Sequence, residues 1–418
     1  MQWTLIYLSA TVATALSTSK PPQNSLTDGL DVLYESNKLN QYIEDLVDVS
    51  DRTKASLGLA ANLRKRVDPS EVSSFNQFFR FIIEFQKEYR FEREIGQAFQ
   101  RFKAAEASIN AAKKRNPHAE FGVTKFSDLS TEEFIQQYTG VPPSVVDKFK
   151  AGKTTVGSTA SGQKDSTLTH TRVTTVDEWS SENQTESRFK RSSNSTDSSL
   201  AAFDWRLLGG VTEIKDQGKC AASYAFAAIA AIESIYTIKF KKAIDLSEQH
   251  AIACTYNNTD YENDGCNGGD PSEILQFAVD QGLVTENSWP YKLQFYRNGS
   301  KIAKCRQFKN QQRYFDYFEF LPMYDEDSMK QKLISNGPLV SYIDATDLQF
   351  YLSGIITAKS RDINHAVLTV GHGLDVKAGP YWIAKNSWGK DFGEQGYIRF
   401  GLGKNSANIG AFNIEIVP

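Results

Sequence analysis

The sequence is poor in the residues that build metal sites, and it lacks the charge excess of nucleic-acid-binding proteins. It has 5 His and 4 Cys among 418 residues, with no metal-ligand spacing and no glycine-rich phosphate loop. The formal net charge is only −3, which argues against nucleic acid or an anionic membrane surface as a partner. No run is long and apolar enough to span a bilayer. We therefore expect no metal, no cofactor, no nucleic acid and no membrane span.

What remains is an ordinary globular composition, with 40% hydrophobic and 23% charged residues, in a chain long enough for two or three domains. Residues 1–15 are apolar and end in Ala13-Thr14-Ala15, a small-x-small pattern that predicts a signal peptide. The usual basic residue before the apolar stretch is missing, and a buried N-terminal strand is the alternative. A signal peptide implies a secreted protein, or one of the lysosomal or endosomal lumen, where disulfides persist.

Residues 16–70 form a polar extension to which the sequence assigns no role. Residues 71–140 are predicted to be a helical domain, because apolar residues recur at helical spacing in Phe75, Phe78, Phe79, Ile82 and Ile83. A second helix is predicted over 92–114. The segment Gly122-Val-Thr124-Lys-Phe126-Ser-Asp128 follows it.

Pro142-Pro143 is interpreted as a break in the helical pattern, and residues 141–200 are rich in Ser and Thr, which predicts a linker. The linker holds Arg188-Phe-Lys190-Arg191, interpreted as a convertase-type cleavage site or, alternatively, as an isolated basic cluster. Glycosylation sequons begin at Asn183, Asn194, Asn257 and Asn298.

Residues 201–418 read as a helical part followed by a strand-rich part, which predicts an α+β domain with a cleft between its halves. A Gly-bearing loop, Asp216 to Ala222, leads into an apolar helix that begins near Ser223. A nucleophile at such a helix N-terminus is stabilised as an anion by the helix dipole. Of the five His residues, His365 and His372 are the candidates for its general base, and His250 is explained by packing.

These motifs resemble those of papain-like cysteine proteases, in particular a cathepsin L/F-like precursor with an inhibitory propeptide. The signature C-G-[SA]-C-[WY] matches Cys220–Tyr224, except that Ala221 replaces Gly and Ser223 stands at the nucleophile. The propeptide pattern G-x-N-x-F-x-D matches 122–128 with Thr124 for Asn. The helical propeptide motif of the family is half present: Glu94, Phe102 and Ile109 fit it, whereas Ala98, Ala105 and Lys113 do not.

The resemblance implies a papain-like two-domain fold, with a helical half and a β-barrel-like half. It implies that His365, 142 residues after Ser223, is the base and that Asn386 orients it. Gln217 and the backbone N–H of Ser223 would form the oxyanion hole, with Trp388 shielding the His365–Asn386 bond. His372, where relatives carry Tyr, is interpreted as a turn or core residue.

The resemblance also implies a specificity pocket and a disulfide pattern. Residues assigned to substrate binding are Gly268, Gly269, Asp270, Pro271, Tyr342, Ala366 and Trp388. Tyr342 replaces a small aliphatic residue and either narrows the pocket or packs inward. The implied disulfides are Cys220–Cys266 and Cys254–Cys305; a third family bridge has no cysteines here, near either Arg361 or Ile409.

Two classes of function follow. The first is an inactive protease homologue, a monomer that acts as a binding or scaffold protein for a peptide or protein ligand in the cleft and for its own propeptide. The second is a hydrolase that uses Ser223, His365 and Asn386, with a silicatein-like activity as a variant. An engineered Cys-to-Ser change in an active protease is a third interpretation.

Overall fold

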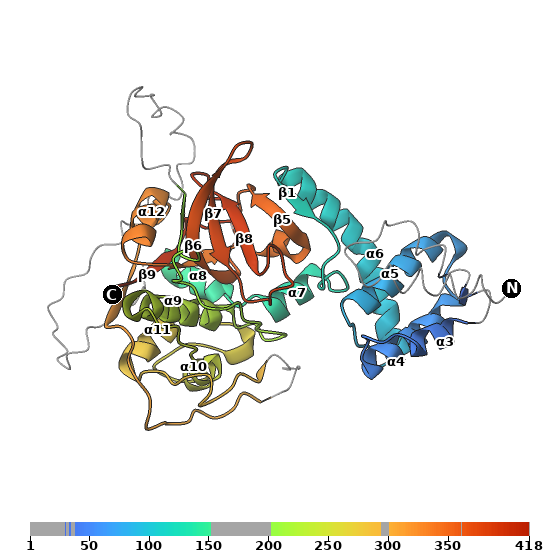
Figure 1. Ribbon diagram of the computed structural model, residues 1–418, viewed down its shortest axis with the longest axis horizontal. Coiled ribbons are helices and arrows are strands. Elements are labelled where there is room, and N and C mark those ends of the chain that lie inside the picture. The colour runs from blue at the N-terminus through green and yellow to red at the C-terminus, as the bar shows by residue number, and fades with distance from the viewer. Residues whose placement is uncertain are drawn as a thin grey trace. The chain divides into compact units, whose positions relative to one another are not determined.

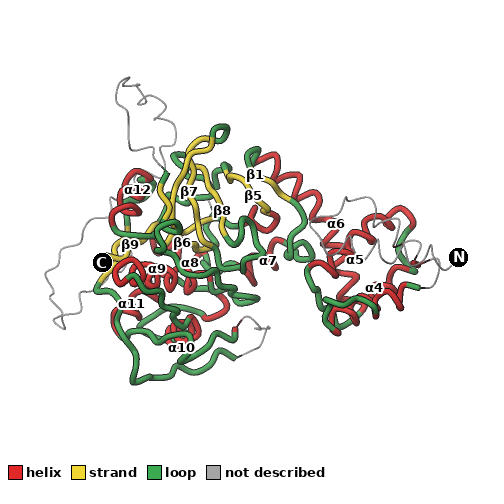
Figure 2. Tube along the Cα trace, in the orientation of Figure 1, coloured by secondary structure: helices red, strands yellow, loops and turns green. Residues whose placement is uncertain are grey.

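The computed structural model describes residues 30, 33–34, 38–151, 202–293, 301–360 and 362–417 (Figures 1 and 2). The predicted signal peptide, the convertase-type site and the sequons at Asn183, Asn194 and Asn298 lie outside the described residues. The chain packs into two compact units. The first takes residues up to 109 together with 125–130, and the second takes 110–124 and everything from 131 onward.

The first unit is helical. Its elements are α3 (Leu39–Glu44), α4 (Asp51–Arg64), η1 (Pro69–Glu71), α5 (Val72–Glu84) and most of α6 (Glu92–Arg115). The predicted apolar face of α5 is buried except for Ile83, which is half-buried. Its Phe75 and Phe78 rings lie 5.0 and 5.5 Å from the ring of Phe99 on α6. Part of the polar extension joins this core, because α4 buries Leu57, Ala60 and Ala61 in the same apolar cluster.

Asp128, a residue of the predicted propeptide motif, forms side-chain hydrogen bonds within the first unit. Its carboxylate accepts hydrogen bonds from Lys87 Nζ at 2.7 Å and from the Tyr89 hydroxyl at 2.8 Å. Burial, together with the neighbouring Asp128 carboxylate, raises the pKa of Tyr89. The motif residue therefore joins its loop to the chain between α5 and α6.

The second unit contains the strand-rich half and the helices around it. Its helices are α7 (Thr131–Tyr138), α8 (Pro143–Lys150), α9 (Ser223–Phe240), α10 (Glu248–Thr255), η4 (Gly265–Asn267), α11 (Pro271–Asp280), α12 (Glu326–Ser335) and η6 (Thr346–Phe350). Its strands are β1 (Ala119–Phe121), β2 (Phe203–Asp204), β3 (Tyr317–Phe320), β4 (Leu339–Ile343), β5 (Tyr351–Ile356), β6 (His365–Asp375), β7 (Gly379–Lys385), β8 (Tyr397–Gly401) and β9 (Asn413–Val417).

The strands follow the order β1-β5-β8-β7-β6-β4-β9-β3, with β2 pairing with β6. The resemblance implied a barrel-like half, but this strand path is open, with β1 at one end and β3 at the other. Figure 1 shows α9, α10 and α11 gathered on one side of the sheet. Helix α9 is apolar on all sides apart from Glu233 and is buried from Ser223 to Ile235, as expected for a helix between a sheet and other helices.

Helix α8 lies within the first residues of the predicted linker. The pair Pro142-Pro143, interpreted as a break, starts this helix instead, because proline is well tolerated at the first helical position. Val145, Val146 and Phe149 are buried along one face of α8.

Both implied disulfides are present. Cys220 is joined to Cys266 and Cys254 to Cys305, so no cysteine is free. Among the described helices, none is both long and apolar enough to cross a membrane. His250 packs against the rings of Phe277, Trp289 and Phe308, as its core interpretation expects. His372 is also buried, but it lies in strand β6, opposite Trp382 on β7, and not in a turn.

Candidate active site

Ser223 is the first residue of α9, at the end of the loop that contains the Cys220–Cys266 disulfide. Gly218 adopts a left-handed backbone conformation in this loop, with φ at 59°. The Ser223 side chain is fully buried. Its Oγ accepts a hydrogen bond of 3.1 Å from the backbone N–H of Ala366, the residue after His365.

His365 starts strand β6 and contacts the two residues that the sequence assigned to it. Its Nε2 lies 2.8 Å from Oδ1 of Asn386, and the ring centroid of Trp388 lies 4.7 Å from that of the imidazole. With Asn386 Oδ1 as the acceptor, His365 carries its proton on Nε2, which leaves Nδ1 as the basic nitrogen. That Nδ1 is buried and has no hydrogen-bond partner among the residues that the structure describes. Burial lowers the pKa of His365 to about 4, against the opposing effect of the Asn386 bond, so the imidazole is neutral near pH 7.

The two predicted oxyanion donors converge on one backbone oxygen of the chain itself. Gln217 Nε2 donates to the carbonyl of Thr139 at 3.1 Å, and the Ser223 N–H donates to the same oxygen at 3.3 Å. Trp388 Nε1 donates to the neighbouring carbonyl of Tyr138 at 2.7 Å. The segment after α7 therefore lies directly over the nucleophile position.

Gly140 continues this segment between Asn364 and Gly269. Its N–H donates to the carbonyl of Asn364 at 3.0 Å, and its own carbonyl accepts from the N–H of Gly269 at 2.9 Å. A Cβ at Gly140 would lie 2.8 Å from the Ser223 nitrogen and 2.9 Å from Ser223 Oγ, so only glycine fits here without displacement. Sequence reasoning missed Thr139 and Gly140, because main-chain pairing leaves little trace in residue type. The glycine directly before Val141-Pro142 is the only signal in the sequence.

Of the residues assigned to substrate binding, Asp270 and Ala366 both lie beside Tyr342. Gly268, Gly269 and Asp270 form one loop, and Pro271 begins α11. Tyr342 packs inward, with no exposed surface, and its hydroxyl donates to Asp270 Oδ1 at 2.6 Å. Ala366 lies opposite Tyr342 in the β4–β6 pairing. Burial raises the pKa of Asp270, while the Tyr342 bond opposes that shift.

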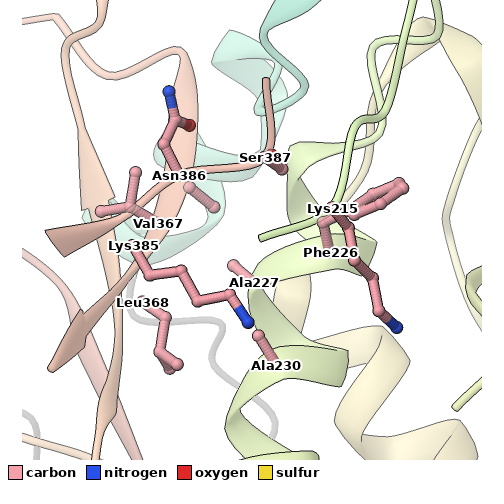
Figure 3. A pocket seen from close by; sticks show the side chains of 10 residues that line it. Lys215, Phe226, Ala227, Ala230, Val367, Leu368, Lys385, Asn386 and Ser387 are labelled. Carbon is pink, nitrogen blue, oxygen red and sulfur yellow. The ribbon is translucent and has the colours of Figure 1, made fainter. Parts of the chain in front are cut away.

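A charged cluster around Lys215 lies near Asn386 and α9, and its Glu233 and Glu248 side chains are buried. Lys215 Nζ contacts the carboxylates of Glu233 at 2.8 Å, Glu248 at 2.7 Å and Asp245 at 2.8 Å. Figure 3 shows Lys385 reaching from β7 toward Ala227 and Ala230 on α9, beside a small cavity. Burial lowers the pKa of Lys385 to about 8. Lys215 therefore joins the loop before Ser223 to α9 and to the start of α10.

Within the described ranges, no group of three or more His, Cys, Asp or Glu side chains could hold a metal ion. Chemically, the site combines a hydroxyl, a neutral imidazole oriented by an amide, and two converging N–H donors. That set belongs to acyl transfer. In this structure the donors are occupied by the carbonyl of Thr139.

Comparisons with known proteins agree with these observations. The family model "Papain family cysteine protease" matches residues 200–416, and "Cathepsin propeptide inhibitor domain (I29)" matches 78–134. The chain is 32% identical over 339 residues to a viral cathepsin of Mamestra configurata nucleopolyhedrovirus, covering 79% of this chain and 85% of that one. It is 31% identical over 366 residues to cysteine proteinase 15A of Pisum sativum, covering 83% and 88%.

Among solved structures, a digestive procathepsin L 3 of Tenebrio molitor superposes with a TM-score of 0.61 at 26% identity, covering 82% of this chain and 99% of that one. A recombinant stem bromelain precursor gives a TM-score of 0.62 at 27% identity, covering 82% and 98%. The chain therefore belongs to the papain family of cysteine proteases, in the form of a precursor with a propeptide inhibitor domain.

Proposed function

We propose that this family member has no proteolytic activity, because Ser223 stands where the family has its nucleophilic cysteine, and that it acts as a binding protein. The nucleophile of a cysteine protease is a thiolate, formed because a helix terminus and an imidazolium lower the thiol pKa. A serine hydroxyl is far less acidic, so it would have to lose its proton to His365 during attack.

The observation that carries this proposal is the hydrogen bonding of Ser223. Its Oγ accepts the N–H of Ala366, and no bond links it to His365, whose Nδ1 has no partner among the described residues. A general base must lie within hydrogen-bond reach of the proton that it removes. The burial of Tyr342 and its hydrogen bond to Asp270, two residues assigned to the specificity pocket, also support a role in binding over the turnover of large side chains.

We assign the protein to a secreted or lysosomal compartment. Its two disulfides support this location, since such bonds persist in oxidising compartments. The apolar start of the sequence, which lies outside the described residues, is consistent with it.

The second candidate is a serine hydrolase at the same site. The retained pair of oxyanion donors favours it, because Gln217 Nε2 and the Ser223 N–H still converge on one carbonyl oxygen. Such donors commonly contribute 10²- to 10³-fold to acyl-transfer rates.

One experiment separates the two candidates. The protein is cut within residues 152–201, and the wild type, Ser223→Cys and Ser223→Ala forms are treated with a fluorophosphonate probe, an epoxide thiol probe and a peptide substrate. We expect labelling and turnover only in the Ser223→Cys form, which also proves that the site can be reached. Fluorophosphonate labelling of the wild type that disappears in Ser223→Ala establishes the serine hydrolase instead. If the Cys form stays unlabelled, the series is repeated with Gly140→Trp, which clears the segment from Ser223.

A further inference from the structure

We propose that the chain carries a second processing site, the peptide bond between Arg66 and Val67, where an endoprotease specific for paired basic residues cuts it and releases residues 38–66. These residues contain α3 and α4 and are here called the helical extension. Hydrolysis adds one water molecule across the bond and leaves a carboxylate on Arg66 and an amino group on Val67. The inference concerns the chain as a substrate, so it does not depend on the activity of Ser223.

The site is a run of basic residues in the turn after α4. Arg64 is the last residue of α4, and Lys65 and Arg66 follow it directly. Lys65, Arg66 and Asp68 are exposed, and η1 begins at Pro69. Exposed turns are preferred sites of proteolysis, and helix ends open locally at low free-energy cost. This turn can therefore adopt the extended form that a protease binds.

The contacts of the basic side chains are weak enough for a protease to break. Arg66 forms an ion pair with Glu92, but the Arg66 side chain is 63% exposed and that of Glu92 is 39% exposed. Lys65 donates to Asn62 Oδ1 at 3.3 Å, also at the surface. Exposed pairs of this kind contribute at most about 1 kcal/mol. Val67 packs partly against the apolar core of the first unit, so the turn has to open by a few residues before the cut.

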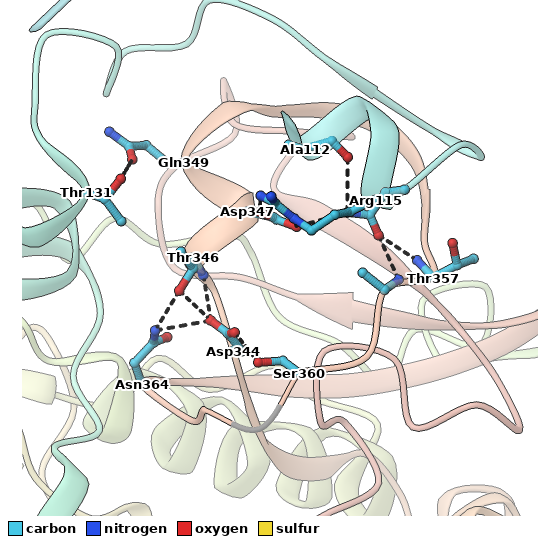
Figure 4. A network of polar contacts seen from close by, with 12 residues as sticks. Ala112, Arg115, Thr131, Asp344, Thr346, Asp347, Gln349, Thr357, Ser360 and Asn364 are labelled. Atoms are coloured by element: carbon cyan, nitrogen blue, oxygen red, sulfur yellow. Dashed lines mark hydrogen bonds and ion pairs between the residues drawn. The ribbon is translucent and has the colours of Figure 1, made fainter. Parts of the chain in front are cut away.

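Two other runs of adjacent basic residues lie within the described ranges, and neither offers such a site. Lys113-Lys114-Arg115 ends α6, and Figure 4 shows Arg115 paired with Asp347. The next residue, Asn116, is fully buried, and its Oδ1 accepts two backbone N–H groups at 2.9 and 2.8 Å. Lys241-Lys242 contains no arginine. Of the three runs, only 64–66 combines arginine with an exposed turn.

The Arg66–Val67 bond is also a natural boundary within the first unit. The match to the family's propeptide inhibitor domain begins at residue 78, so α3 and α4 precede it. Both disulfides lie in the peptidase domain, and neither joins the helical extension to another part of the chain. After the cut, the extension is held by non-covalent contacts alone. Its share of the apolar core is Leu39, Ile43, Leu57, Ala60 and Ala61.

The helical extension binds the turn between α5 and α6 through specific hydrogen bonds. Ser56 Oγ accepts the N–H of Tyr89 at 2.8 Å, and both residues are buried. Gln86 has a left-handed backbone conformation, with φ at 49°. Its Oε1 accepts the N–H of Ser50 at 3.2 Å, and its Nε2 donates to the carbonyl of Asp48 at 3.0 Å. The extension therefore fixes the conformation of residues 85–91.

The cut changes how these contacts are maintained. A short covalent link keeps the extension at an effective concentration of about a millimolar beside its binding surface, and cutting removes this advantage in dilute protein. When the extension leaves, the Tyr89 N–H loses Ser56 as its acceptor. Because the Tyr89 hydroxyl is a donor to Asp128, the change reaches the propeptide motif. Processing after Arg66 would thus loosen the inhibitor domain at a place remote from the linker.

The test uses the full chain carrying Ser223→Ala, so that every cut comes from the added enzyme. The folded protein is incubated with a purified subtilisin-type proprotein convertase, and new N-termini are identified by mass spectrometry. We expect a terminus at Val67 and none at Asn116. A folded chain that yields no Val67 terminus overturns the inference.

Two variants separate the basic run from the ion pair that it makes. Arg66→Gln removes the recognition residue together with the pair, and it should abolish the cut. Glu92→Gln removes the pair alone, and it should be cut at least as fast as the parent chain. If Glu92→Gln resists cutting as Arg66→Gln does, the site is not recognised through its basic residues and the inference is wrong.

Release of the extension is measured by hydrogen–deuterium exchange before and after the cut, at about 1 μM protein. We expect peptides that cover 85–91 and 125–130 to exchange about 10-fold faster after the cut. Uncut Ser56→Ala should show part of this increase in 85–91, whereas Gln41→Ala, at an exposed position, should show none. Exchange that a complete cut leaves unchanged contradicts the release of the extension.

Discussion

Tyr342 and Asp270 are joined by a hydrogen bond of 2.6 Å inside the cleft wall, and both side chains are buried. Asp270 also accepts the N–H of Ser272 at the start of α11. Tyr342 is therefore bonded to the residue that caps α11. A substitution at Tyr342 should accordingly affect the stability of α11.

For Tyr342→Phe, we expect a loss of about 1–3 kcal/mol in the free energy of unfolding, because the buried Asp270 carboxylate loses its hydroxyl donor. Urea unfolding of the full chain measures this loss. Tyr256→Phe is the matched control, since Tyr256 is 38% exposed. Equal stability of the two variants would show that the Tyr342–Asp270 bond contributes nothing net.

For Lys215→Met, we expect a loss of about 3–5 kcal/mol, because Glu233 and Glu248 would keep buried carboxylates without their cation. Burial already raises the pKa of Glu248 to about 7, with Lys215 opposing the shift. Thermal unfolding at pH 7 is the measurement. Lys390→Met removes an exposed pair with Glu213 and should change the melting temperature little. A comparable fall in both variants contradicts this prediction.

His250 should make the fold sensitive to acid. Burial lowers its pKa to about 4, below the ordinary value of about 6.5. Its neutral form therefore stabilises the fold fully above about pH 6.5, and this contribution is lost as the pH falls toward 4. Relative to a His250→Leu variant, the wild type should lose about 1–3 kcal/mol between pH 7 and pH 4.

The comparison with His250→Leu is needed because Glu273 and Glu248, each with a pKa raised to about 7 by burial, act in the opposite direction. Denaturant unfolding at several pH values gives the difference. If the difference in the free energy of unfolding between the wild type and His250→Leu does not change with pH, the prediction is wrong. His250 would then be more open to solvent than its aromatic neighbours suggest.

Asn257 is the one sequon within the described residues, and we expect it to carry a glycan when the protein is secreted from eukaryotic cells. It lies in an exposed turn with φ at 49°, close to the Cys254–Cys305 bridge. Peptide mass spectrometry before and after glycan removal tests the site, with Asn257→Gln as the control. An unmodified Asn257 peptide in secreted protein rules the site out.

The sequence predicted those parts of the structure that depend on local motifs. The buried face of α5 and the helix that begins at Ser223 follow from apolar periodicity. The two disulfides were expected from the family resemblance. The contact of His365 with Asn386 and Trp388 was expected from short motifs that relatives share.

The parts that could not be predicted depend on contacts between distant main-chain atoms or on weak patterns. The Thr139 carbonyl over Ser223 has no side-chain signature. Helix α4 buries small residues such as Ser56, Ala60 and Ala61, which give little amphipathic signal. The first residues of the predicted linker form α8, because a Pro-Pro pair can begin a helix as readily as it can end one.

Strand β1 has a consequence for the handling of the protein. Without residues 119–121, β5 would present unpaired N–H and C=O groups along an open sheet margin. Such margins are templates for pairing with other chains and lead to aggregation. Preparations that begin at the peptidase domain alone should therefore self-associate, because they lack the strand that pairs with β5.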